Sequence, residues 1–139
     1  MKNSLKGRRA LVTGATRGIG EAIAVRLKLQ GAHVIATGTS LAGKAPKGCS
    51  YEAVDFSDSL AAETFARKAA TMDLDILVNN AGINKISLFE DIDPEDFDLI
   101  QRINVRAPFL LCRAVLPRMK KKKWGRIVNV SSIFSKIAK

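Results

Sequence analysis

A glycine-rich segment near the N-terminus is the feature that most constrains how this chain folds. Residues 11–20 have the sequence LVTGATRGIG; they begin at a short apolar stretch and lead into an amphipathic one that ends before Gly31. A continuous apolar run predicts a buried strand, whereas apolar residues spaced three and four apart predict a helix. The sequence therefore predicts a strand, a glycine-rich turn and a helix in that order.

The turn between this strand and this helix contains three glycines, Gly14, Gly18 and Gly20. Glycine adopts backbone conformations that are closed to other residues and allows a ligand to approach the chain closely. The N–H groups and the dipole at a helix N-terminus attract negative charge. We therefore predict that the turn binds a diphosphate group; the alternative is a purely structural turn.

Segments typical of strands and helices alternate along the rest of the chain. We expect strands at residues 9–13, 32–37, 50–54, 74–78 and 126–130, and helices at 18–30, 58–70 and 97–122. Residues 41–48 are expected to form a short helix or a loop. Ser57 is expected to cap the second helix, Asp93 to cap a helix that begins at Pro94, and Ala107-Pro108 to break the last one. This alternation predicts a parallel sheet with helices on both faces.

Four segments of the chain together resemble the short-chain dehydrogenase/reductase family. They are residues 13–20 (TGATRGIG), Val54-Asp55, residues 77–82 (LVNNAG) and residues 125–132 (GRIVNVSS). Within the family, the bacterial 3-oxoacyl-carrier-protein reductases are the subgroup that the chain most resembles. The resemblance implies an α/β fold, a Rossmann-type doubly wound parallel sheet of strand order 3-2-1-4-5, with residues 1–139 as one NAD(P)-binding domain.

The resemblance also implies which residues form the site. The expected cofactor-binding residues are Gly14, Thr16, Arg17, Gly18, Ile19, Gly20, Thr39, Ser40, Asp55, Phe56, Asn80, Ala81 and Gly82. Asp55 resembles the aspartate that contacts the adenine, with Phe56 as a flat neighbour; we favour this role over the alternative, a loop carboxylate ahead of a helix cap. Asn80 is expected to tie neighbouring strands through its amide. Asn104 and Ser132 resemble the family's catalytic asparagine and serine, and Ser131 is the alternative to Ser132.

One part of the family's pattern does not occur in this sequence. The resemblance implies a Tyr-x-x-x-Lys motif about a dozen residues after the catalytic serine, and the 139-residue sequence ends seven residues after Ser132. The only tyrosine is Tyr51, ahead of the third strand. We therefore expect a chain truncated after the fifth strand, which binds NADP(H) but is inactive alone. In the full-length form it would interconvert a ketone and a secondary alcohol by hydride transfer. The alternative is a non-catalytic nucleotide-binding or protein-interaction module.

The end of the second expected strand distinguishes between the two nicotinamide cofactors. An acidic residue there commonly binds the ribose hydroxyls of NAD and repels the 2′-phosphate of NADP. Residues 35–40 have the sequence IATGTS, which contains no carboxylate. The hydroxyls of Thr39 and Ser40, with Arg17 and Lys44 nearby, suit a phosphate better. We expect NADPH rather than NADH, although Arg17 is equally compatible with a solvent-facing charge.

The positive charge of the chain lies almost entirely in its last part. Residues 1–100 hold 12 Lys and Arg against 13 Asp and Glu, whereas residues 101–139 hold 11 Lys and Arg and no acid. The densest cluster lies at residues 118–126, where Trp124 is the only aromatic residue. Such a cluster is compatible with nucleic-acid binding. We favour a solvated helix end, because nucleic-acid surfaces interleave aromatic residues with the basic ones.

The remaining expectations concern partners and location. No secretory signal or membrane-spanning run is evident, so we expect a cytoplasmic protein. Cys49, Cys112 and His33 lack the spacing of a metal site, and we expect no metal. The expected partners are a small carbonyl or alcohol substrate and further copies of the chain. The copies would pair through the helix at 97–122 or through the exposed edge of the fifth strand.

Overall fold

The computed structural model describes residues 4–132 and contains one parallel sheet. Its strands are β1 (Arg9–Val12), β2 (His33–Gly38), β3 (Ser50–Ala53), β4 (Ile76–Asn79) and β5 (Arg126–Asn129). They lie in the order β3-β2-β1-β4-β5, and every neighbouring pair is parallel. The predicted Rossmann-type fold and strand order are therefore confirmed.

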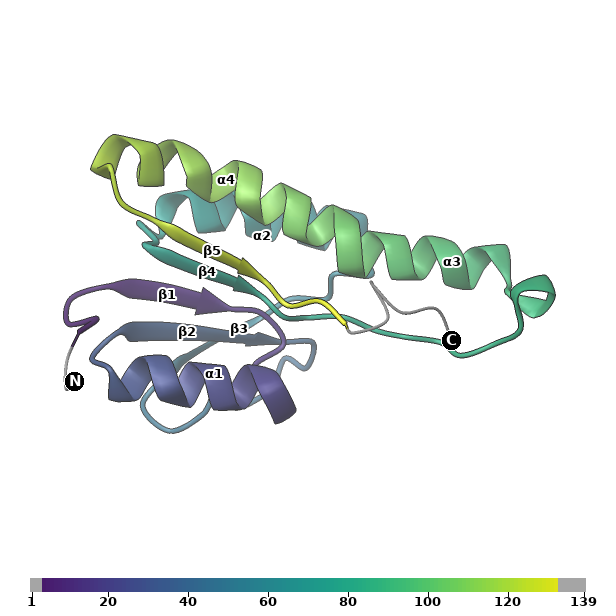
Figure 1. Cartoon of the computed structure of the whole chain (residues 1–139), viewed down its shortest axis with the longest axis horizontal. Helices are drawn as coiled ribbons and strands as arrows, with labels where there is room; N and C mark the ends of the chain where they lie inside the picture. The colour runs from purple at the N-terminus through teal and green to yellow at the C-terminus, as the bar shows by residue number, and fades with distance from the viewer. Residues whose placement is uncertain (1–3, 133–139) are drawn as a thin grey trace.

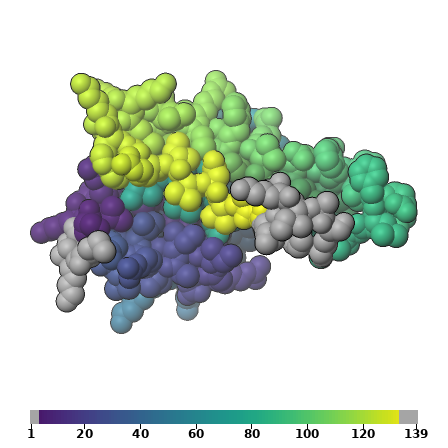
Figure 2. Space-filling view, viewed as in Figure 1, coloured from purple at the N-terminus to yellow at the C-terminus, as the bar shows by residue number. Residues whose placement is uncertain are grey.

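Helices cover both faces of the sheet. Helix α1 (Gly18–Leu29) lies on one face, and α2 (Ser59–Thr71) and α4 (Ala107–Lys122) lie on the other, whereas α3 (Pro94–Gln101) extends beyond the end of the sheet (Figure 1). Short helical turns also occur at η1 (Phe89–Asp91) and η2 (Arg102–Arg106). Residues 41–48 form a loop, so the alternative of a short helix there is wrong. In Figure 2 the segment around η1 and α3 projects from one end of the molecule.

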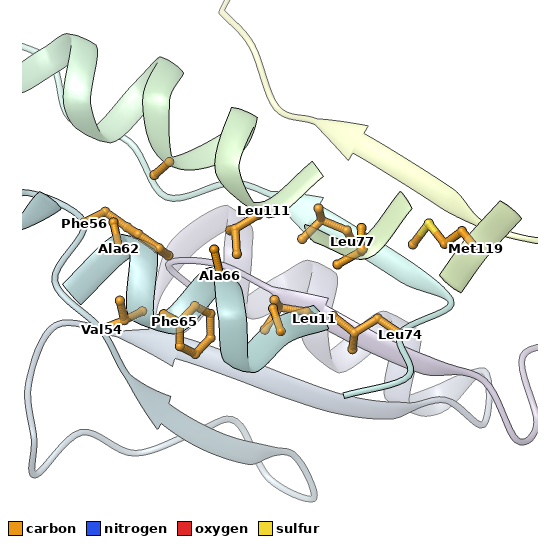
Figure 3. Close-up of a cluster of buried hydrophobic side chains, with 13 residues drawn as sticks. Leu11, Val54, Phe56, Ala62, Phe65, Ala66, Leu74, Leu77, Leu111 and Met119 are labelled. Carbon is orange, nitrogen blue, oxygen red and sulfur yellow. The ribbon is translucent and has the colours of Figure 1, made fainter. Parts of the chain in front are cut away.

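Alternating strand residues divide the core between the two faces. Leu11 and Leu77 point toward α2 and α4, where they pack with Phe65 and Leu111 (Figure 3). The intervening strand residues pack under α1 with Ala24; they are Ala10, Val12, Val34, Ala36, Ile76 and Val78. A strand with both faces covered is apolar at every position, which explains the continuous apolar run that predicted β4.

The helix starts confirm one expected cap and correct another. The Asp93 carboxylate accepts a hydrogen bond from the Glu95 N–H, and Pro94 is the first helical residue of α3, as predicted. Helix α2, however, is capped by Asp58, whose carboxylate accepts from the N–H groups of Leu60 and Ala61. The expected cap, Ser57, lies one residue too early to reach those donors.

The last expected helix consists of two helices joined by a π-helical turn. Helix α3 begins at Pro94, the start expected from the Asp93 cap, and α4 runs to Lys122 as predicted. The break lies at η2 (Arg102–Arg106), just before the expected one at Ala107-Pro108. Proline at the second position of α4 needs no intrahelical N–H bond, so Pro108 is compatible with a helix start.

Candidate functional site

The carboxyl ends of β1, β2 and β4 meet at one edge of the sheet, where buried Thr13 links two of them. The Thr13 hydroxyl oxygen accepts hydrogen bonds from the N–H groups of Asn80 and Ala81, each at 2.9 Å. The Thr37 hydroxyl at the end of β2 accepts from the Gly14 N–H at 3.2 Å. Thr13 and Thr37 were not among the predicted site residues. Their position could have indicated this role: each is a polar residue at the end of an otherwise apolar strand. A hydroxyl that is buried there needs a hydrogen-bond partner.

Asn80 ties β4 to the glycine-rich turn, as expected. Its side-chain amide donates to the carbonyl oxygens of Thr13 at 2.9 Å and Gly14 at 3.1 Å. Gly14 has a φ of +62°, and a Cβ atom there would lie 2.9 Å from the Cα atom of Ala81. Only glycine fits this position, because any side chain would be strained and would collide with backbone.

The glycine-rich turn presents the N-terminus of α1 at this edge. Thr16, Arg17, Gly18 and Ile19 are exposed, and Ile19 retains 66% of its accessible surface. Arg17 is the N-cap residue of this helix, and its side chain makes no capping bond. Gly18 has a φ of +60° with open space beside it, whereas buried Gly20 packs against the Gly14 carbonyl and the Asn80 amide. This cradle fits an anionic group such as a diphosphate.

The residues after β2 also lie at this edge and carry no acid. Thr39, Ser40 and Lys44 are all exposed. Together with Arg17, they are the residues whose hydroxyl and cationic groups were predicted to suit the 2′-phosphate. None of them is buried, so all remain accessible to a ligand that covers the carboxyl ends of the strands.

Asp55 and Phe56 follow β3 and differ in exposure. Asp55 is exposed, and one of its carboxylate oxygens accepts from the Ser57 N–H at 2.9 Å and the Ser57 hydroxyl at 2.7 Å. Phe56 is 95% buried and meets Phe65 edge to face, with the ring centroids 6.1 Å apart. The Phe56 ring is therefore part of the core, and its expected place beside a bound adenine stays a prediction.

Asn104 lies in the π-helical turn and holds the segment after β4. Its amide oxygen accepts from the Ile83 N–H at 2.9 Å, and its amide nitrogen donates to the Ile83 carbonyl at 2.8 Å. A Cβ atom on Gly82 would lie 3.3 Å from the Asn104 amide oxygen. The structure thus brings Gly82 and Asn104 together, and the bend explains how asparagine is accommodated within a long helical segment.

Ser131 and Ser132 leave β5 beside the end of β4, and both are exposed. The Val130 N–H donates to the Asn79 carbonyl at 2.9 Å, which extends the pairing of the two strands beyond β5. The Asn79 amide donates to the Asn129 amide oxygen at 2.8 Å. The two serines therefore follow the strand next to the one that leads into Asn80, Ala81 and Gly82.

The basic cluster lies at the opposite edge, among the amino ends of the strands. Lys122 donates to the carboxylate of buried Asp75 at 3.1 Å. Burial acts to raise the pKa of Asp75, but the Arg9 N–H and Lys122 outweigh it and hold this pKa below its ordinary value. Trp124 contacts two cations, with Arg8 at 3.7 Å and Arg126 at 5.0 Å from its ring centroid. Part of the cluster is therefore engaged within the fold.

Fold and turn together define the class of protein. A parallel Rossmann-type sheet with a glycine-rich turn between β1 and α1 is a nucleotide-binding fold. A family model described as short chain dehydrogenase matches residues 8–138. The chain belongs to this family of oxidoreductases.

Curated relatives agree with this assignment. The chain is 41% identical to D-beta-hydroxybutyrate dehydrogenase of Cupriavidus necator, over 96% of this chain and 56% of the relative. It is 37% identical to a 3-oxoacyl-acyl-carrier-protein reductase of Aquifex aeolicus, over 96% of this chain and 58% of the relative. The chain thus spans a little more than half the length of these relatives.

Solved structures match the fold closely. A metagenomic short-chain oxidoreductase in complex with NADP superposes with a TM-score of 0.84 at 37% identity, over 98% of this chain and 67% of that one. A short-chain dehydrogenase from Streptomyces avermitilis also gives a TM-score of 0.84, at 30% identity over 99% of this chain and 53% of that one. Within residues 4–132, no helix has the length and apolarity needed to cross a membrane.

Proposed function

We propose that the chain holds NADP(H) across the carboxyl ends of its strands. The observation that carries this proposal is the cradle at the N-terminus of α1, which only glycines could form at Gly14 and Gly20. The N–H groups of the first turn of α1 bind the diphosphate, and the segment from Asn80 to Gly82 lines the other side of the cofactor. Asp55 binds the adenine with Oδ2, the carboxylate oxygen that Ser57 does not contact.

The proposed preference for NADPH rests on charge. The 2′-phosphate is bound by Arg17 and by the hydroxyls of Thr39 and Ser40, with Lys44 contributing a further positive charge. No carboxylate follows β2, so nothing there repels a phosphate. The solved short-chain oxidoreductase in complex with NADP, which is 37% identical to this chain over the aligned residues, supports the binding of NADP.

The proposed chemistry is the interconversion of a ketone and a secondary alcohol. The cofactor supplies or accepts the hydride when bound. Ser132 donates a hydrogen bond to the carbonyl oxygen and stabilises the negative charge that develops there, and Ser131 is the alternative donor. Asn104 uses one lone pair and one proton on Ile83, which leaves its amide a further acceptor and a further donor for a water.

We propose that the 139-residue chain binds the cofactor without turning over substrate. Tyr51, its only tyrosine, lies on β3, whereas Ser132 follows β5 at the other edge of the sheet. Four inter-strand spacings of about 4.8 Å separate these strands by about 19 Å. Tyr51 is therefore too far from Ser132 to protonate the same oxygen. Loss of a general acid lowers the rate by about 10²–10⁴-fold.

We further propose that the chain forms a homo-oligomer through α3 and α4. Phe97, Val105 and Phe109 are more than half exposed along this helical segment. Val105 and Phe109 also line a cavity of about 460 Å³, together with Asp98, Gln101, Arg102 and Arg106. The edge strand β5 is the second candidate surface, because Val128 is 48% exposed. Phe109→Glu is expected to lower the mass measured by sedimentation if the helices pair, and to leave it unchanged if β5 does.

Two experiments test the proposed cofactor and the proposed inactivity. Arg17→Ala is expected to weaken NADPH binding about tenfold and to leave NADH binding unchanged, because only NADPH has the 2′-phosphate. Arg67→Ala, an exposed arginine on α2, is the matched control. Equal effects of the two substitutions on NADPH would contradict the assignment of Arg17. With 3-hydroxybutyrate and NADP⁺ the chain is expected to form NADPH about 10²–10⁴-fold more slowly than a short-chain dehydrogenase that carries the general acid, and a rate equal to that enzyme's would contradict the proposed inactivity.

A further inference from the structure

Tyr51, on β3, contacts the backbone of the turn that follows β2. Its side chain lies on the same face of the sheet as that of its register partner Ala36, which is the face covered by α1. Its hydroxyl donates a hydrogen bond of 2.6 Å to the carbonyl oxygen of Ser40. The same oxygen also accepts from the Gly43 N–H at 3.0 Å, which closes the turn at residues 40–43. Tyr51 therefore anchors, from β3, the turn that follows β2.

Two glycines make room for the phenol ring. A Cβ atom on Gly38 would lie 2.9 Å from the Tyr51 hydroxyl and 2.6 Å from a methyl carbon of Thr16 in the glycine-rich turn. A Cβ atom on Gly43 would overlap the Tyr51 hydroxyl and the ring carbon that bears it. Tyr51 is thus packed against the end of β2 on one side and the turn at 40–43 on the other. A rigid ring in this position defines where the Ser40 backbone lies.

We infer that Tyr51 is the positioning residue for the 2′-phosphate of NADP, through the turn at residues 40–43. This inference rests on the proposed function, in which Ser40 contacts that phosphate. By holding the Ser40 carbonyl, the phenol orients the Ser40 hydroxyl and the start of the loop that carries Lys44. A turn ordered in advance costs less entropy when the phosphate binds.

The action of Tyr51 is indirect. A tyrosine hydroxyl has one proton to donate, and here it is donated in the hydrogen bond to the Ser40 carbonyl. The remaining lone pairs of the phenol oxygen repel a phosphate oxygen instead of binding it. A direct contact with the ligand therefore does not explain the residue, whereas anchoring of the turn does. NADH has no 2′-phosphate, so its binding does not depend on how this turn is ordered.

The test is calorimetric titration of Tyr51→Phe with NADPH and with NADH. This substitution removes one oxygen atom and keeps the ring, so the packing against Gly38 and Gly43 is preserved. The dissociation constant of NADPH is expected to rise about fivefold, which corresponds to about 1 kcal/mol or one neutral hydrogen bond. The dissociation constant of NADH is expected to change by less than about twofold. Gly43→Ala, which displaces the ring, is expected to change the ratio of the two constants in the same direction.

A matched control removes a similar hydroxyl elsewhere. The Thr71 hydroxyl donates to the Lys68 carbonyl at 2.8 Å near the end of α2, so Thr71→Val loses the same kind of bond. It is expected to leave both dissociation constants unchanged. If the unsubstituted chain prefers NADPH and Tyr51→Phe keeps that preference, the inference about Tyr51 is wrong and the cofactor proposal stands. If the unsubstituted chain binds neither nucleotide, or shows no preference, the proposed function fails and the inference fails with it.

Discussion

Replacing Thr13 by valine tests whether its hydroxyl holds the site together. Threonine and valine have nearly the same shape, so the substitution removes the hydroxyl and leaves the packing of this buried residue almost unchanged. It deprives the N–H groups of Asn80 and Ala81 of their shared acceptor. Both amides belong to the segment that follows β4, so the loss affects the edge at which the cofactor is proposed to bind.

The expected cost follows from those two amides. A buried N–H group left without an acceptor costs about 1–3 kcal/mol. Both groups are only partly buried, so each is taken at the lower end of that range. The free energy of unfolding is therefore expected to fall by about 2–3 kcal/mol in Thr13→Val, out of a total of about 5–15 kcal/mol for a domain of ordinary stability.

Chemical denaturation of the two Thr13 variants distinguishes this account from one based on burial alone. Thr13→Ser keeps the hydroxyl and loses one buried methyl group, at a cost of about 1 kcal/mol. We expect the serine variant to be more stable than the valine variant. Burial alone predicts the reverse order, because valine is the more apolar residue. A valine variant as stable as the unsubstituted chain would refute the reasoning.

Three further substitutions test separate parts of the structure. Gly14→Ala is expected to lower the free energy of unfolding by about 1–3 kcal/mol, because alanine is strained at positive φ and would collide with Ala81; thermal unfolding measures this. The pKa of Asp75 lies below its ordinary value, so its charge stabilises the fold above about pH 4, and this stabilisation is lost as the pH falls through the folded-state pKa. Asp75→Asn is therefore expected to flatten the loss of stability below about pH 4 in urea titrations, and an unchanged slope would contradict it. Phe56→Ala is expected to lower the free energy of unfolding by about 3–5 kcal/mol because the ring is part of the core. A loss below about 1 kcal/mol would contradict the burial of the ring.

Much of the fold follows from local patterns in the sequence. The strands and helices were predictable because each has its own periodicity and because β4 is apolar at every position. The strand order followed from the resemblance to a known family. The cap at Asp93 was predictable because an acid followed by proline is a strong local signal. The cap of helix α2 was predicted at the wrong residue, because Asp55, Ser57 and Asp58 are all of types that cap helices and only the backbone geometry selects Asp58.

Details that depend on contacts between distant segments could not be predicted. Phe56 follows a site residue, and nothing local shows that its ring turns inward toward Phe65. The π-helical turn around Asn104 depends on the bonds to Ile83, which lies 21 residues earlier. The role of Tyr51 depends on the register of β2 and β3, which places its ring beside Gly38 and the Ser40 carbonyl. Such contacts become visible only when the strands are assembled.

The central claim is that this chain alone forms a preorganised site for NADP(H). Calorimetric titration of the purified 139-residue chain with NADPH, repeated with NADH, tests it most directly. The account predicts a dissociation constant for NADPH in the micromolar range or below, about tenfold tighter than for NADH. That ratio corresponds to about 1.4 kcal/mol for the contacts to the 2′-phosphate. A chain that is folded by circular dichroism and binds neither nucleotide, or that binds NADH more tightly, would contradict the claim.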